Sequence, residues 1–353
     1  MALDPSDERA QDRPTEADGL PVVAQDHDMR AARRRRLWRI AGISLSAALI
    51  VISAVVLFNI LRTVSWADLR AAFAATSWEQ IFAAAGFTLL SYVALTGYDA
   101  LALRQLALRV PYRITALGSF TSYAISFTLG FPLITGGTVR YWIYSQQGVS
   151  AGKVASLTVI AGITFWLGMA IVVGAALVID PVAVAEVNQL KVWVNTLLGI
   201  AILGGVLAYL IWVSIDNRRL QFQGLTLELP GFGVTCGQMI LGVIDLCAAA
   251  MALFVLLPQG HGTDFISFAA SYVFGCIVGI VSHTPGGLGP FEVTMLKAVT
   301  APTQEGVLAS LLLFRAVYYV VPFVLALAML GAHESVRRWA SLRAAMSSSS
   351  EPK

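Results

Sequence analysis

Long apolar segments alternate with short polar ones along most of this chain. A helix that crosses the bilayer needs about 20 predominantly apolar residues. Six segments meet that requirement, at residues 40–61, 80–101, 154–179, 192–213, 232–257 and 306–331. The pattern predicts an all-α polytopic membrane protein with about six transmembrane helices.

Two further apolar stretches, 114–138 and 266–290, contain residues that interrupt a helix. Proline removes a backbone donor, and glycine weakens a helix. Non-helical backbone at bilayer depth persists only where it is buried in protein or lines a water-filled cavity. We therefore predict two re-entrant helical hairpins, each returning to the side it entered from. The predicted hairpin-forming residues are Pro132, Gly136, Gly137, Pro285, Gly286, Gly287 and Gly289.

Charge is scarce and unevenly placed. Charged residues make up 13% of the chain, against about 25% in soluble proteins. An arginine-rich collar at 30–39 precedes the first span and predicts cytoplasmic termini by the positive-inside rule. The later arginines agree with this orientation only if both broken stretches return to the side they came from.

The order of segments predicts two membrane units in an inverted repeat. Each unit reads span, span, hairpin, span, so the first hairpin faces the cytoplasm and the second the exterior. The predicted organisation is a disordered polar tail at 1–29, the collar at 30–39, repeat 1 at 40–179, an outer loop at 180–191, repeat 2 at 192–331 and a cytoplasmic tail at 332–353.

Several function classes are disfavoured. The net charge of +3 is too small to suggest nucleic acid binding. The three cysteines lie in apolar segments and the four histidines are scattered, so no metal site is expected. The chain has no phosphate loop, no HExxH and no GxSxG. We expect no cofactor.

Ionisable residues within membrane segments are functional candidates by default. Arg140 follows the first break and would either bind a lipid phosphate or anchor the segment at the cytoplasmic face. Glu292 follows the second break. Arg315 lies inside the last span and needs a partner, for which Glu292 is the first choice and Asp245 the other. That pair would either hold the hairpin in place or contact substrate.

Three more candidates are open in role. Asp245, near the centre of its span, would bind a cationic head group, relay a proton or pair with Arg315. Asp99 would be satisfied by Arg104 or Arg140. His283 precedes the second break and would titrate near neutral pH, although a lone histidine is more often a packing residue. The full predicted substrate-binding set is Arg140, Asp245, Glu292, Arg315, Asp99, His283 and Tyr144.

At these positions the chain resembles the membrane domain of the bacterial lysylphosphatidylglycerol synthase/flippase family, the multiple peptide resistance factors. The matching stretches include TGGTVRYWIYSQQGVSAGKVA (135–155), GIVSHTPGGLGPFE (279–292) and LLLFRAVYYVVPFVLAL (311–327). The resemblance implies movement of aminoacylated phosphatidylglycerol from the inner to the outer leaflet. In the family, synthesis belongs to a separate soluble C-terminal domain, for which no counterpart follows Arg343. Translocation without synthesis is therefore expected.

The leading hypothesis is a flippase-like, non-enzymatic translocator of a membrane phospholipid in the bacterial inner membrane. The alternative is an accessory scaffold that presents lipid, hopanoid or polyprenyl intermediates to a separate synthase or glycosyltransferase. A membrane-embedded transferase is a third reading, which the short loops disfavour. An oligomer is compatible with every one of these readings.

Overall fold

The computed structural model describes residues 70, 73–74, 76–130, 132–215, 219–222, 225–228, 230–282 and 285–349. The first part of the described chain contains α3 (Trp78–Gln105), α4 (Tyr112–Leu129), α5 (Pro132–Tyr144), η1 (Ser145–Gln147), α6 (Ala151–Ile179), α7 (Pro181–Asn188) and α8 (Val192–Ile215). The second part contains β1 (Arg219–Phe222), β2 (Leu225–Glu228), α9 (Phe232–Phe254), α10 (Phe265–Val281), η2 (Pro285–Gly287), α11 (Pro290–Ala298), α12 (Gln304–Phe314), η3 (Arg315–Val320) and α13 (Val321–Ser349).

The predicted class, an all-α polytopic membrane protein, is confirmed. Five stretches in the described part of the chain are long and apolar enough to cross a membrane, and they coincide with five of the six predicted spans: α3, α6, α8, α9 and the continuous run Gln304–Val336. The sixth predicted span, 40–61, lies outside the described residues, as do the tail at 1–29 and the collar at 30–39. Strands β1 and β2 form one short antiparallel ribbon between α8 and α9.

Helix α13 extends well beyond the last predicted span. It continues to Ser349 and so includes residues 332–349 of the predicted cytoplasmic tail, whose side of the membrane stays a prediction. No proline or glycine occurs between Ala332 and Ser349, and alanine, leucine, arginine and glutamate there favour a helix. The helix therefore continues past the apolar segment.

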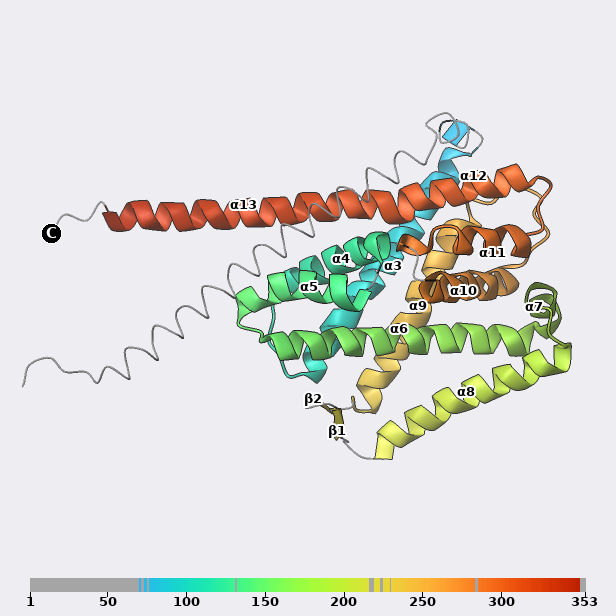
Figure 1. The fold of residues 1–353 in the computed structure, drawn as a ribbon, viewed down its shortest axis with the longest axis horizontal. Coiled ribbons are helices and arrows are strands. Elements are labelled where there is room, and N and C mark those ends of the chain that lie inside the picture. The colour runs from blue at the N-terminus through green and yellow to red at the C-terminus, as the bar shows by residue number, and fades with distance from the viewer. Residues whose placement is uncertain are drawn as a thin grey trace, which may run out of the picture. The chain divides into compact units, whose positions relative to one another are not determined.

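Helices α4 and α5 form the first helical hairpin and run side by side (Figure 1). The break comes directly after α4, where Gly130 has a φ of 80°, a conformation that glycine adopts without strain. Pro132 opens α5, a position where its missing N–H costs nothing. Gly136 and Gly137, which were predicted to help form the hairpin, lie inside α5 and not at its turn. The helix continues through both residues, and the missing side chain at Gly136 leaves room for α4.

Helices α10 and α11 form the second helical hairpin, joined through η2. Gly286, Gly287 and Gly289 have φ values of 61°, 66° and 91°, so the turn uses the conformational freedom of glycine three times. Pro290 then opens α11. This break falls where the sequence places it, while the predicted return of each hairpin to its own side of the membrane stays a prediction.

The described helices pack around α3 and α9, which lie against each other, with α6 packed on both (Figure 1). The order of α3, the first hairpin and α6 recurs as α9, the second hairpin and the last long helical run. That order agrees with a repeat, and the inverted orientation of the two units stays a prediction.

Glycine permits the closest contact between α6 and α9. A Cβ atom on Gly168 would lie 2.6 Å from the backbone carbon of Gly242, and one on Gly242 would lie 2.9 Å from the Gly168 Cα. Small residues of this kind let transmembrane helices approach until their backbones touch. Since neither backbone can move without displacing its whole helix, this contact fixes how α6 crosses α9.

We expect Gly168→Ala to destabilise the protein by roughly 1–3 kcal/mol, because the added methyl group overpacks a backbone contact. Thermal unfolding of the purified protein in detergent would measure this. The matched control is Gly204→Ala in α8, where a Cβ meets no atom within 4 Å. Equal melting temperatures for the two variants would contradict the proposed contact.

Candidate functional site

A cavity of about 420 Å³ lies between the two helical hairpins and is closed by α6, α9 and η3. Most of its lining is apolar or aromatic, and its polar groups include the side chains of Arg140 and Asp245. Three apolar side chains at its edge, Leu133, Ile134 and Ile280, are 65%, 69% and 42% exposed. The cavity is therefore mainly apolar, with a few ionisable and hydroxyl groups in its wall and an apolar rim.

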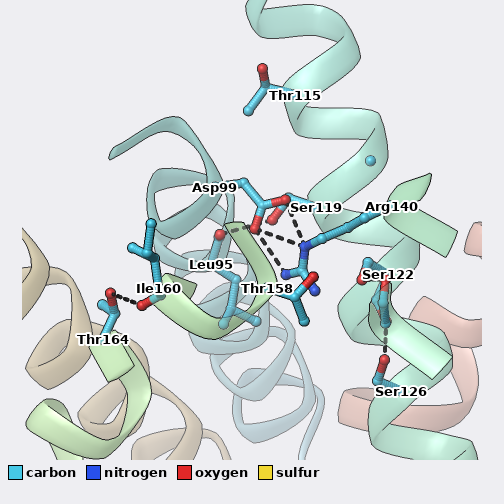
Figure 2. A network of polar contacts seen from close by, with 12 residues as sticks. Leu95, Asp99, Thr115, Ser119, Ser122, Ser126, Arg140, Thr158, Ile160 and Thr164 are labelled. Carbon is cyan, nitrogen blue, oxygen red and sulfur yellow. Dashed lines mark hydrogen bonds and ion pairs between the residues drawn. The ribbon is translucent and has the colours of Figure 1, made fainter. Parts of the chain in front are cut away.

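Arg140 and Asp99 form a buried ion pair (Figure 2). The guanidinium of Arg140 donates from Nε to Asp99 Oδ2 at 2.9 Å and from Nη2 to Oδ1 at 2.8 Å. Asp99 is fully buried and Arg140 is 3% exposed. Tyr144 donates its hydroxyl to Asp99 Oδ2 at 2.8 Å. The structure thus gives Asp99 the partner Arg140 rather than Arg104, and Tyr144 joins the same cluster.

A stripe of hydroxyl residues on α4 supports this pair. Thr115, Ser119, Ser122 and Ser126 are spaced by four, three and four residues and so share one face of the helix. The Ser119 hydroxyl donates to the Leu95 carbonyl of α3, and the Ser126 hydroxyl donates to the Ser122 carbonyl within α4 (Figure 2). The Ser122 hydroxyl donates to a carbonyl of α5. None of these four residues was among the predicted site residues, although their helical spacing is visible in the sequence and indicates a polar face of α4.

Gly136 explains how close α4 and α5 come. A Cβ atom there would lie 2.8 Å from the Ser126 hydroxyl and 3.1 Å from Arg140 Nη1. Ser122 donates its hydroxyl to the Gly136 carbonyl at 2.9 Å. The glycine therefore makes room for the guanidinium beside α4.

Part of the hydrogen-bonding capacity of Arg140 is unused. Its Nε and Nη2 groups bind Asp99, and Nη1 makes no hydrogen bond to a described residue. Its guanidinium carbon lies 4.6 Å from the centre of the Tyr123 ring. The Tyr123 hydroxyl, buried beside Arg140, donates its proton to no acceptor in the part of the chain that the structure describes. A buried donor without a partner is costly, so this position calls for an acceptor.

Arg315 pairs with Glu292, the partner that the sequence favours. Arg315 Nε donates to Glu292 Oε1 at 2.8 Å, and Nη1 donates to the carbonyl of Gly286 in the second hairpin. Glu292 also accepts from the backbone N–H of Gly289 at 2.7 Å. The pair therefore fastens the glycine-rich turn to the last helix, at the point where η3 forms a π-helical segment.

Asp245 has no such partner. It is 2% exposed, and it accepts hydrogen bonds from Ser91 Oγ at 2.5 Å and from Tyr98 Oη at 3.0 Å. The Ser91 hydroxyl is in turn bonded to the Tyr318 hydroxyl at 2.8 Å. Within the described residues no cationic side chain lies within 4 Å of Asp245, so Arg315 is not its partner.

The remaining predictions are placed as follows. His283 lies outside the described residues. The cysteines, all of them described, are free, and the described residues hold no group of three or more potential metal ligands. Ser91, Tyr98 and Tyr123 were not among the predicted site residues. They reach Asp245 and Arg140 because the fold brings together helices that are distant in the sequence.

Comparison with known proteins places these features in a family. The family model for the Lysylphosphatidylglycerol synthase TM region matches residues 40–326. Protein slr0712 of Synechocystis is 31% identical over 319 residues, which is 90% of this chain and 99% of the relative. Inner membrane protein YbhN of Escherichia coli is 24% identical over 293 residues, 82% of this chain and 91% of the relative.

A third relative is much longer than this chain. Phosphatidylglycerol lysyltransferase of Staphylococcus aureus is 25% identical over 310 residues, which is 83% of this chain and 34% of the relative. The similarity thus covers about a third of the lysyltransferase.

The buried pair predicts a test by double substitution. Asp99→Leu alone should cost about 3–5 kcal/mol, because Arg140 stays buried without its partner. Asp99→Leu combined with Arg140→Met should cost less than either single change, as measured by thermal unfolding in detergent. The exposed Arg113→Ala should change stability by less than about 0.5 kcal/mol. Additive costs in the double variant would contradict a direct pair.

Proposed function

This chain belongs to the family of the Lysylphosphatidylglycerol synthase TM region, and on that premise we propose that it moves a membrane phospholipid across the bilayer. The first candidate is aminoacylated phosphatidylglycerol, carried from the inner to the outer leaflet of the bacterial inner membrane. The observation that carries the proposal is the cavity between the hairpins, with ionisable groups inside and exposed apolar residues at its edge.

The cavity suits a lipid that enters from the side. Its volume of about 420 Å³ falls in the range of small-molecule sites, roughly 300–1,000 Å³. Leu133, Ile134 and Ile280 offer the acyl chains an apolar surface while the head group enters the cavity, where Arg140 and Asp245 are exposed to it. A charged head group gains most from such a site, because the hydrocarbon around it solvates charge poorly.

Arg140 is the group best placed to bind the lipid phosphate. Asp99 binds one edge of its guanidinium through Nε and Nη2, which keeps the planar fork oriented and leaves Nη1 as a donor. The Tyr123 hydroxyl beside it is a second donor without an acceptor. A phosphate oxygen that accepts from both groups would satisfy them together.

The second hairpin supplies the other end of the site. The Arg315–Glu292 pair fastens its turn, and Gly286 and Gly287 line the cavity. In the proposed orientation the first hairpin faces the cytoplasm and the second the exterior, so lipid would pass from Arg140 toward this turn. Since the chain carries no nucleotide-binding motif, a lipid or proton gradient would drive movement. No bond is made or broken in this scheme.

Transbilayer movement in liposomes is the direct test. The purified protein, reconstituted, should move labelled phosphatidylglycerol or its lysyl ester between leaflets. Arg140→Ala and Glu292→Gln should abolish movement while both proteins still insert, because each removes a charge from a buried pair. Normal movement in both variants would refute the site. If the wild-type protein moves neither lipid, translocation is wrong, and an accessory scaffold for a separate synthase becomes the better account.

Tyr123→Phe separates function from stability. Removing a buried hydroxyl whose proton has no acceptor should leave the melting temperature unchanged or raise it, since an unsatisfied polar group costs about 1–3 kcal/mol. Lipid movement should nevertheless slow, because the phosphate loses one donor. Tyr141→Phe, on an exposed face of α5, is the matched control and should change neither quantity. Full transport by Tyr123→Phe would exclude the hydroxyl from the site.

A further inference from the structure

Two of the described residues that line the cavity have charged side chains, Arg140 and Asp245, and the surroundings of these two groups differ. The guanidinium of Arg140 faces the carboxylate of Asp99, so that pair is neutral as a whole. Asp245 is 2% exposed, and within the described structure no cationic side chain lies within 4 Å of it. An ionised carboxylate in this position is expensive, because the membrane interior solvates charge poorly.

The titratable groups that interact with Asp245 carry no positive charge. They are tyrosines and one cysteine on the neighbouring helices and one cysteine on its own helix: Tyr92 and Tyr98 of α3, Tyr123 of α4, Tyr272 and Cys276 of α10, Tyr318 of η3, and Cys247 of α9. Groups of both kinds ordinarily ionise above about pH 8 and are never cationic. Among the described residues nothing therefore compensates the ionised carboxylate, and protonation is the remaining way to remove its cost.

The hydroxyl groups around Asp245 accommodate both of its protonation states. The ionised carboxylate accepts from Ser91 at Oδ1 and from Tyr98 at Oδ2. The Ser91 hydroxyl also contacts the Tyr318 hydroxyl at 2.8 Å, and either atom can be the donor. When Asp245 gains a proton on Oδ1, it donates to Ser91, which then donates to Tyr318. The change needs only a reorientation of hydroxyl groups, and these contacts persist.

The carboxyl of Asp245 and the proposed phosphate site belong to one cluster. Arg140 lies 4.6 Å from the centre of the Tyr123 ring, and that ring packs edge-on against Tyr98 with centres 6.1 Å apart. Tyr98 in turn donates to Asp245. Because Arg140 is already neutralised by its ion pair, a bound phosphate adds a net negative charge to the cavity. Two like charges about 10 Å apart, at an effective dielectric constant of about 20, weaken each other's binding by roughly tenfold.

We propose that Asp245 is a proton-binding site coupled to phosphate binding in the cavity, so that a proton is taken up with each phosphate group that binds. A hydronium ion from the aqueous phase supplies the proton and is left as water, and the O–H bond of the carboxyl group is the bond that forms. By linkage, protonation strengthens phosphate binding by the same factor as phosphate strengthens protonation. The phosphate site at Arg140 rests on the proposed function. Since the proton would travel with the lipid, outward movement would draw on the lipid gradient.

Proton uptake on binding tests the coupling without requiring transport. The purified full-length protein, in detergent and weakly buffered solution, is titrated with short-chain phosphatidylglycerol while a pH indicator reports the protons taken up. We expect uptake as the lipid binds and an affinity that falls by roughly tenfold as the pH rises from about 6 to about 8.5. Asp245→Asn keeps the shape of the neutral carboxyl and cannot exchange a proton. It should take up none and should keep the high affinity at every pH.

Matched variants separate the coupling from folding. Glu305→Gln removes an exposed carboxylate at the start of α12 and should behave as the wild-type protein does. If Asp245→Asn does not fold, Tyr98→Phe replaces it as the test. That variant loses a donor to the ionised carboxylate, so the fall in affinity should move to higher pH. A purely structural role of Tyr98 would change the melting temperature and leave the position of that fall where it is.

Lipid binding without proton uptake, or an unchanged pH dependence in Asp245→Asn, overturns the proposal. Loss of the pH dependence in His283→Gln but not in Asp245→Asn would assign the proton to that histidine and overturn it as well. If phosphatidylglycerol does not bind, the phosphate site fails and the coupling falls with it.

Two further arms separate the sources of phosphate and the two proposals. Glycerophosphoglycerol is the same head group without acyl chains, and equal proton uptake with it would support the proton site and assign it to soluble phosphate esters. Proton uptake without movement in liposomes would refute the proposed translocation and leave the coupled site standing. Movement without uptake would do the reverse.

Discussion

Burying a charge among membrane helices is costly, and the pair of Arg140 and Asp99 shows how this chain compensates two such charges at once. The guanidinium and carboxylate meet through two short hydrogen bonds in a site that excludes solvent almost completely. Bringing them together requires α3, α4 and α5 to converge. The hydroxyl stripe of α4 and the missing side chain of Gly136 serve that convergence. The first hairpin is thus built around one ion pair.

The second hairpin follows the same principle with different parts. Its turn needs three glycines with positive φ, and a guanidinium from the last helix holds that turn through Glu292 and a backbone carbonyl. Both hairpins are thus held by contacts outside their own turns, and the cavity lies between them, lined by Arg140 from the first and by Gly286 and Gly287 from the second.

The comparisons cover very different shares of the relatives. This chain aligns with nearly the whole of slr0712 and YbhN, yet with about a third of phosphatidylglycerol lysyltransferase. The shared region contains the helix breaks and the buried charges, and the cavity they form is the feature that a common role in lipid handling would use.

The sequence by itself determined the class of protein, the spans in the described part and the second helix break. These depend on apolar length and on proline and glycine, which act on the backbone within a few residues. It also indicated that Arg315 would pair with Glu292, which lies only 23 residues away along the chain. Only the tertiary structure decided the partners of Asp99 and Asp245. The Ser91 hydroxyl, which donates to Asp245, also contacts Tyr318, a residue 227 positions further along the chain, and no local sequence pattern indicates such a contact. Helix periodicity fixes the face on which a residue lies, while the crossing of α3 with α9 decides what that face meets.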